Sequence, residues 1–357
     1  MDENELPIEN EIPVDWADVS SPDDSGATEV VSVGGKSVES SFDEEAETLD
    51  ELHRALEDLR LEIRSRIPVS EGGEARGVDW LALLDELRAR FNSFGMTERS
   101  AIVDEFGMDE FTLKRARLLL DFLMDRYFRV DVEGAGSLPE NQPYLLVANR
   151  SGLLPYDGLM IAHAVERARP GSSRARFLVA DWLITLPFAQ SFLARLGGVR
   201  ACRENADRLL RSGHSVIAFP EGVHGAAKVF RERYQLKRFG RGGVVRAALE
   251  CKVPLVPVGV VGAEEAHPLL FKARLLGRAI GLPFLPVTPT FPFLGALGLL
   301  PLPTKWVITI GDPIELDYDD PDAADDELRV SRLTAELRSK IQELVDQGLT
   351  ARESVWS

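Results

Sequence analysis

The chain has 357 residues, of which 45% are hydrophobic and 28% are charged, a composition typical of a globular protein with a substantial core. Its net charge of −17 arises mostly in residues 1–50, which hold sixteen acidic residues and one lysine. The remaining chain is close to neutral, so it lacks the wide basic surface that nucleic-acid binding requires. The sequence contains no apolar run of about 18 residues and no signal-peptide pattern, and we therefore expect neither a membrane-spanning helix nor export.

The two cysteines, Cys202 and Cys251, stand without a CxxC pair or a neighbouring histidine. This pattern predicts neither a disulfide framework nor a metal site, and it favours a reducing compartment.

Residues 1–45 are acidic, rich in Ser, Gly and Pro, and free of hydrophobic periodicity, which predicts a disordered tail. We expect a solubilising role for this tail, with docking of a partner as the alternative. Residues 46–128 predict a helical module whose apolar stripes serve core packing. In its first helix, over 46–69, apolar side chains recur at steps of three and four residues, namely Leu49, Leu52, Leu56, Leu59 and Ile63.

From about residue 129 the pattern changes to short apolar runs that alternate with helical stretches. The runs that predict strands cover 144–149, 176–180, 215–220, 255–262 and 306–311. Their continuous hydrophobicity indicates burial on both faces, as in the largely parallel or mixed sheet of an α/β protein. We therefore predict an α/β domain with flanking helices over 129–320, followed by a C-terminal helix (326–347) and tail over 321–357.

Residues 281–303 are almost wholly apolar and contain six prolines. The prolines break any helix, and a segment without regular hydrogen bonding cannot satisfy its backbone inside a bilayer. The composition leaves two alternatives, a buried loop packed on the domain or an apolar surface that rests on a membrane.

Two segments place polar groups directly after predicted strands. NRSGLLPYDG (149–158) puts Asp157 at the start of a helix, where the helix dipole favours a carboxylate; a simple N-cap is the alternative interpretation. FPEG (219–222) brings Glu221 and Gly222 to the end of another strand. Ligands of open α/β sheets bind at the carboxyl ends of the strands, so both segments are candidates for the site.

A basic segment follows, HGAAKVFRERYQLKRFGRGG (224–243), with six basic residues against one acidic residue. Such a concentration in a nearly neutral body predicts a site for a phosphate or an anionic head group; a solvated charged face is the alternative. The segment GGVRACREN (197–205) adds Arg200 and Arg203.

Residues 129–315 resemble the glycerolipid acyltransferase superfamily, whose members transfer a fatty acyl group from a thioester to lysophosphatidic acid or a related alcohol. Four segments match in order, and they are NRSGLLPYDG, GVRACREN, FPEG and VPLVPVGVVGAEE (253–265). The first is similar to the branch of the family that reads N-H-S-G-x-x-P-x-D, and Pro257 matches the proline of the fourth. The apolar, proline-rich stretch before WVITIGDPI is also typical of this branch, which favours the membrane alternative for 281–303.

The resemblance implies that Asp157 organises a catalytic centre. It also implies a substrate-binding set made up of Arg203, Glu221, Gly222, Lys228 and Arg238. The acyl donor is then acyl-CoA or an acyl carrier protein, and neither a metal nor another cofactor is expected. The implied partners are a phospholipid or lysophospholipid and a membrane surface, without nucleic acid, and we expect a cytoplasmic protein peripheral on the inner face of a membrane.

One residue departs from the family pattern, because Arg150 occupies the position of the family's histidine. That histidine takes the proton of the acceptor hydroxyl, which requires a group that titrates near neutral pH. A guanidinium keeps its own proton and accepts no other. We expect Arg150 to form a salt bridge with Asp157 instead.

Three interpretations remain open at this point. The first is an acyltransferase whose base is Asp157, another side chain or the substrate's phosphate. The second is a weak enzyme that relies on positioning of the substrates. The third is a catalytically silent homologue that binds phospholipid or acyl-CoA. None of the five histidines stands out, although His224 lies close after FPEG and His267 follows the fourth segment. A hydrolase is disfavoured because no G-x-S-x-G occurs, and a nucleotide cofactor because no G-x-G-x-x-G follows the first strand.

Overall fold

The computed structural model describes residues 103–152, 154–184, 189–279, 284–295, 298, 300–320 and 322–356. The predicted acidic tail and the predicted helix over 46–69 lie outside these residues.

The described chain is built on a seven-stranded sheet with the strand order β1-β9-β6-β2-β5-β3-β4. Neighbouring strands are parallel except for β6 and β9, which are antiparallel. A separate antiparallel pair joins β7 to β8. The strands are β1 (Asp131–Glu133), β2 (Leu145–Ala148), β3 (Arg176–Val179), β4 (Gly198–Arg200), β5 (Val216–Ala218), β6 (Leu255–Val261), β7 (Phe271–Ala273), β8 (Leu285–Val287) and β9 (Val307–Ile310). The predicted α/β class with a largely parallel, mixed sheet is confirmed.

All five strands expected from apolar runs are present, and every residue of β2 and of β6 is buried. The other two strands of this sheet, β1 and β4, are not predicted by apolar runs. Each has three residues, and charged side chains such as Asp131 and Arg200 interrupt any apolar run.

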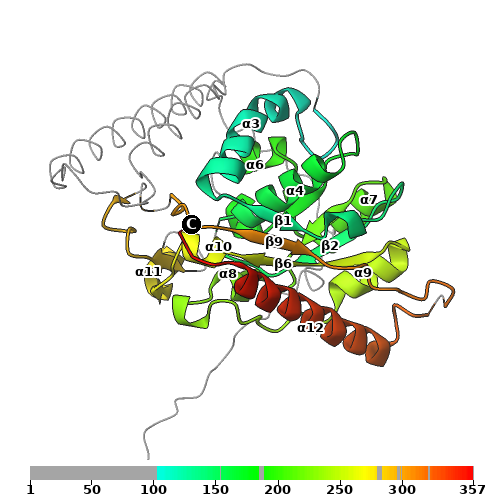
Figure 1. Cartoon of the computed structure of the whole chain (residues 1–357). Coiled ribbons are helices and arrows are strands. Elements are labelled where there is room, and N and C mark those ends of the chain that lie inside the picture. Colours follow the sequence, from blue (N-terminus) through cyan, green and yellow to red (C-terminus); the bar gives the residue numbers. More distant parts are fainter. Residues whose placement is uncertain are drawn as a thin grey trace, which may run out of the picture.

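Helices cover both faces of the sheet, with α3 and α4 on one side and α9 and α12 on the other (Figure 1). The α-helices are α3 (Glu110–Phe122), α4 (Tyr156–Ala168), α5 (Asp181–Ile184), α6 (Ala189–Arg195), α7 (Arg203–Arg211), α8 (Gly222–Ala226), α9 (Gly243–Cys251), α10 (Ala263–Ala266), α11 (Arg274–Ala279) and α12 (Glu327–Ala351). A π-helical turn (Leu123–Tyr127) and two 3₁₀ turns (Ala135–Ser137, Phe230–Glu232) complete them.

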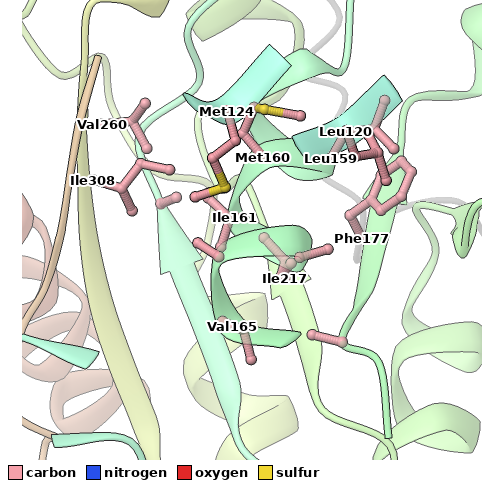
Figure 2. Packing of buried hydrophobic residues seen from close by; sticks show 14 of the residues in the cluster. Leu120, Met124, Leu159, Met160, Ile161, Val165, Phe177, Ile217, Val260 and Ile308 are labelled. Carbon is pink, nitrogen blue, oxygen red and sulfur yellow. The ribbon is translucent and has the colours of Figure 1, made fainter. Parts of the chain in front are cut away.

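The core lies on both sides of the sheet because successive side chains of a strand point to opposite faces. In β2, Leu146 and Ala148 join one hydrophobic cluster, while Leu145 and Val147 join the other. Figure 2 shows the first cluster, in which residues of α4 pack against residues of α3, its following turn and the sheet. Residues 110–128, expected in the helical module, therefore share the core of the α/β domain.

The C-terminal helix α12 is also part of this body. The side chain of Asp326 accepts hydrogen bonds from the backbone N–H groups of Leu328 and Arg329 and so caps the helix. The helix packs on β6 at Gly259, where a Cβ atom would stand 2.8 Å from Leu344. A larger residue at this strand position would push the helix away. Within the described residues, no helix is both long and apolar enough to cross a membrane.

Candidate functional site

The first motif segment (149–158) is tied to the neighbouring strand by Asn149. Its side-chain amide donates to the carbonyl of Val260 at 2.9 Å and its side-chain oxygen accepts from the N–H of Val260 at 2.7 Å. Because β2 and β6 are parallel neighbours, these bonds hold the segment at the carboxyl end of both strands. This is the edge at which ligands bind in open α/β sheets.

Arg150 and Asp157 form a buried ion pair in this segment, as the sequence predicts. Arg150 Nη1 lies 2.8 Å from Asp157 Oδ1, and Asp157 is 2% exposed. Its carboxylate also accepts hydrogen bonds from the N–H groups of Gly158 at 2.8 Å and Ser151 at 3.1 Å. Burial raises the pKa of Asp157, while the guanidinium and these amides oppose the rise. Both carboxylate oxygens of Asp157 therefore accept hydrogen bonds that hold the first motif segment in place.

Glu221 joins the FPEG segment to the first motif segment. Its Oε1 accepts the backbone N–H of Arg150 at 2.8 Å, and its Oε2 accepts the backbone N–H of Lys237 at 2.7 Å. The next helix, α8, comes so close that a Cβ atom at Gly225 would lie 2.5 Å from Glu221 Cβ and 2.8 Å from Arg150 Cβ. Glycine at this position allows the two motif segments to pack together.

Lys228 lies between two buried carboxylates. Its Nζ is 2.7 Å from Glu264 Oε1 and 3.4 Å from Glu221 Oε2, and the second oxygen of Glu264 accepts the N–H of Tyr234 at 3.1 Å. Burial alone would lower the pKa of Lys228, but the two carboxylates raise it. The buried charge cluster thus consists of Arg150, Asp157, Glu221, Lys228 and Glu264, with three carboxylates and two cations.

Glu264 makes the stability of this cluster dependent on pH. Burial raises its pKa to about 7, against the attraction of Lys228. A carboxyl whose pKa is higher in the folded than in the unfolded state takes up a proton on folding, so its stabilisation is present at low pH and is lost as the pH rises through about 7.

We therefore expect the free energy of unfolding to fall by about 1–3 kcal/mol between pH 5 and pH 8 through this residue. Urea unfolding of the wild type and Glu264→Gln at several pH values measures the effect. Over this pH range the free energy of unfolding of the variant should fall much less than that of the wild type. An equal fall in both proteins would contradict the assignment.

Arg203 forms its ion pairs away from the charge cluster. It begins α7, pairs with Glu250 of α9, and has its Nε 3.8 Å from Asp207. Arg238 lies exposed on the basic segment, and Gly222 begins α8 beside Glu221. The structure thus brings together Arg150, Asp157, Glu221, Gly222 and Lys228, whereas no described contact joins Arg203 or Arg238 to them.

A pocket opens beside the cluster. Its empty volume is about 550 Å³, which includes space open to solvent. Its lining combines the first motif segment (Gly152, Leu154), polar groups (Lys228, Arg233, Glu264, His267) and apolar groups of the β7–β8 region (Leu269, Phe284, Pro286).

Glu264 and His267 both lie in the pocket wall, although neither is among the site residues predicted from the sequence. Glu264 belongs to the fourth matching segment, where the acidic pair after a buried strand is a signal for a polar site. His267 offers no such signal, because Tyr156, on which its ring stacks, lies far away in the sequence.

Several known proteins are similar to this chain. A family model described as Acyltransferase matches residues 129–261. An uncharacterized protein of Mycobacterium tuberculosis is 43% identical over 256 residues, which cover 71% of this chain and 71% of that protein. A human protein named DGAT1/2-independent enzyme synthesizing storage lipids is 25% identical over 221 residues, covering 61% of each chain. Among solved structures, the 1-acyl-sn-glycerophosphate acyltransferase of Thermotoga maritima has a TM-score of 0.43 and 19% identity, covering 74% of this chain and 88% of that chain.

Proposed function

This chain belongs to the glycerolipid acyltransferase superfamily, and from that premise we propose that it transfers a fatty acyl group from a thioester donor to a glycerophospholipid-like acceptor. The observation that carries the proposal is the bridge made by Arg150. Its side chain pairs with Asp157 and its backbone N–H binds Glu221, so two motif segments meet at the strand ends beside a pocket.

In this reaction the acceptor hydroxyl oxygen forms a bond to the thioester carbonyl carbon. The carbon–sulfur bond breaks, and the hydroxyl proton is finally transferred to the leaving thiolate. Holding the two reactants in line supplies about 7–11 kcal/mol of barrier reduction in ideal cases. Asp157 and Glu221 contribute by fixing the first motif segment, since each accepts backbone N–H groups from it.

The substrate-binding set of the proposal consists of Arg203, Glu221, Gly222, Lys228 and Arg238. Two of its cations already have carboxylate partners, so a phosphate that binds Arg203 has to displace Glu250, and one that binds Lys228 has to compete with Glu221 and Glu264. Arg238 is exposed and needs no such exchange with a buried carboxylate. The donor is acyl-CoA or an acyl carrier protein, and no cofactor takes part.

The test is acyl transfer by the purified full chain, in vesicles, with labelled acyl-CoA and acyl carrier protein as donors. Lysophosphatidic acid is the first acceptor. A neutral acylglycerol is tested as the second acceptor, because a human relative is named for storage-lipid synthesis. Arg150→His is run alongside the wild type. Turnover by the wild type supports the proposal, and activity in Arg150→His alone overturns it.

A catalytically silent homologue that binds phospholipid or acyl-CoA is the second candidate. Two features favour it. Both carboxylate oxygens of Asp157 already accept hydrogen bonds, from Arg150 and from the N–H of Ser151, and the guanidinium of Arg150 occupies the family's histidine position. Binding of acyl-CoA by the wild type without thiol release from any donor would select this candidate.

We further propose that the protein attaches peripherally to the cytoplasmic face of a membrane through an apolar surface. Six exposed large apolar side chains come from residues 270–294, namely Leu270, Phe271, Leu275, Leu276, Phe293 and Leu294. Leu275 is 87% exposed and Phe293 is 82% exposed. The same stretch supplies Phe284 and Pro286 to the pocket, so lipid bound at this surface lies next to the pocket lining.

Substitution in this surface is expected to weaken membrane binding. Leu275→Glu with Leu276→Glu removes two apolar side chains worth about 1.5–3 kcal/mol each when fully buried and adds charge, so binding to vesicles should fall by at least about tenfold. Co-sedimentation with phosphatidylglycerol–phosphatidylethanolamine vesicles measures it. Leu328→Glu is the matched control, because Leu328 is exposed on α12; equal loss in the control, or no loss in the pair, would refute the surface.

A further inference from the structure

We propose that His267 is the catalytic base that takes the proton of the acceptor hydroxyl. The inference rests on the proposed acyl transfer and names the group that performs the step for which Arg150 is unsuited. An imidazole titrates near neutral pH, which is the property that general-base catalysis requires.

The position of His267 carries the inference. It directly follows α10 at the carboxyl end of β6, which is the strand beside β2. It lines the pocket together with Gly152 and Leu154 of the first motif segment. Its ring stacks on Tyr156, with centroids 5.7 Å apart and an interplanar angle of 15°, and Tyr156 directly precedes Asp157. The imidazole is thus held at the start of α4, in the wall of the pocket.

The other ionisable groups of the site are poorly suited to accept a proton. Asp157 and Glu221 accept hydrogen bonds or an ion pair at both carboxylate oxygens. Glu264 has a pKa of about 7, but one of its oxygens is held by Lys228 and the other by the N–H of Tyr234, so taking the acceptor's proton would break one of these bonds. The phenol of Tyr156 stays protonated at neutral pH, because burial raises its pKa to about 12. Arg233, a further charged group in the pocket lining, is a guanidinium and keeps its proton.

The remaining described histidines lie elsewhere. His163 is buried and has its Nε2 2.8 Å from Asp121 Oδ1. His214 precedes β5, at the end of the strand opposite to Glu221. His224 is exposed on α8. Of the described histidines, His267 is the one found in the pocket wall.

The proton transfers balance without a further reactant. As the acceptor oxygen attacks the thioester carbonyl carbon, its proton passes to a ring nitrogen of His267. When the carbon–sulfur bond breaks, the imidazolium returns that proton to the thiolate, so the products are an ester and a free thiol.

The experiment compares acyl transfer by the wild type, His267→Gln, Arg150→His, the double variant and the control His224→Gln, using labelled acyl-CoA and lysophosphatidic acid or a neutral acylglycerol in vesicles. We expect His267→Gln to lower kcat by about 10²–10⁴-fold with little change in KM, and His224→Gln to match the wild type. In the double variant, the histidine placed beside Asp157 should restore part of the lost rate.

His267→Asn and thermal unfolding of every variant separate loss of the base from loss of the fold. A properly folded His267→Gln or His267→Asn protein that retains wild-type kcat would overturn the inference while leaving the proposed function intact. A wild type that transfers no acyl group from either donor would overturn both.

Discussion

Lys228→Met is expected to lower the free energy of unfolding by about 3–5 kcal/mol. The substitution removes the ammonium between Glu221 and Glu264 and leaves both carboxylates buried without a cationic partner. An isolated buried charge is costly, because neither water nor an opposite charge stabilises it. The loss should be smaller at pH 5 than at pH 8, since the carboxyls can then take up protons.

Urea unfolding at the two pH values checks this result. Lys340→Met is the matched control, because Lys340 lies 3.2 Å from Glu336 in an exposed pair of α12, and such pairs contribute about 0–1 kcal/mol. Adding Glu264→Gln to Lys228→Met should recover part of the stability. A loss below about 1 kcal/mol that does not change with pH would contradict the role given to Lys228.

Asp157→Ala is expected to abolish acyl transfer and to destabilise the fold by about 3–5 kcal/mol. The guanidinium of Arg150 remains buried, at 5% exposure, with its ion pair removed. The backbone N–H groups of Ser151 and Gly158 lose their acceptor, so the first motif segment is no longer held. Thermal or urea unfolding and the acyl-transfer rate are the two measurements.

Asp181→Ala provides a matched control for the stability effect. Asp181 pairs with Arg200 at 2.8 Å, but both side chains are about half exposed, so a change below about 1 kcal/mol is expected. The double variant Arg150→Met with Asp157→Leu should regain stability without regaining activity, because an apolar pair replaces a buried ionic one. Activity in that double variant would show that the pair is not needed for the reaction.

The fold was predictable because the signals are local. β2, β5 and β6 are continuous apolar runs, and α12 shows a 3.6-residue pattern after a capping Asp326. β1 and β4 were not predictable in this way, because charged side chains such as Asp131 and Arg200 interrupt any apolar run. The apolar stripe of residues 110–128 predicts core packing, but a helix stripe does not reveal whether the helix packs on the α/β body or on its own module.

The site was predictable where the groups are close in sequence or belong to a matching segment. The Arg150–Asp157 pair spans seven positions and follows from charge and spacing. The pairing of Arg203 with Glu250 spans 47 positions and depends on how α7 packs against α9. The pairing of Lys228 with Glu264 and the stacking of His267 on Tyr156 likewise arise only when segments distant in the sequence meet.

The most direct measurement of the central claim is a crystal structure of the full chain with a thioether analogue of acyl-CoA, which cannot be cleaved. The account predicts that the thioether group lies in the pocket between Gly152 and His267, with the chain extending along Phe284. An analogue bound outside this pocket, for example over α7 and Arg203, would contradict the assignment of the acyl-transfer site.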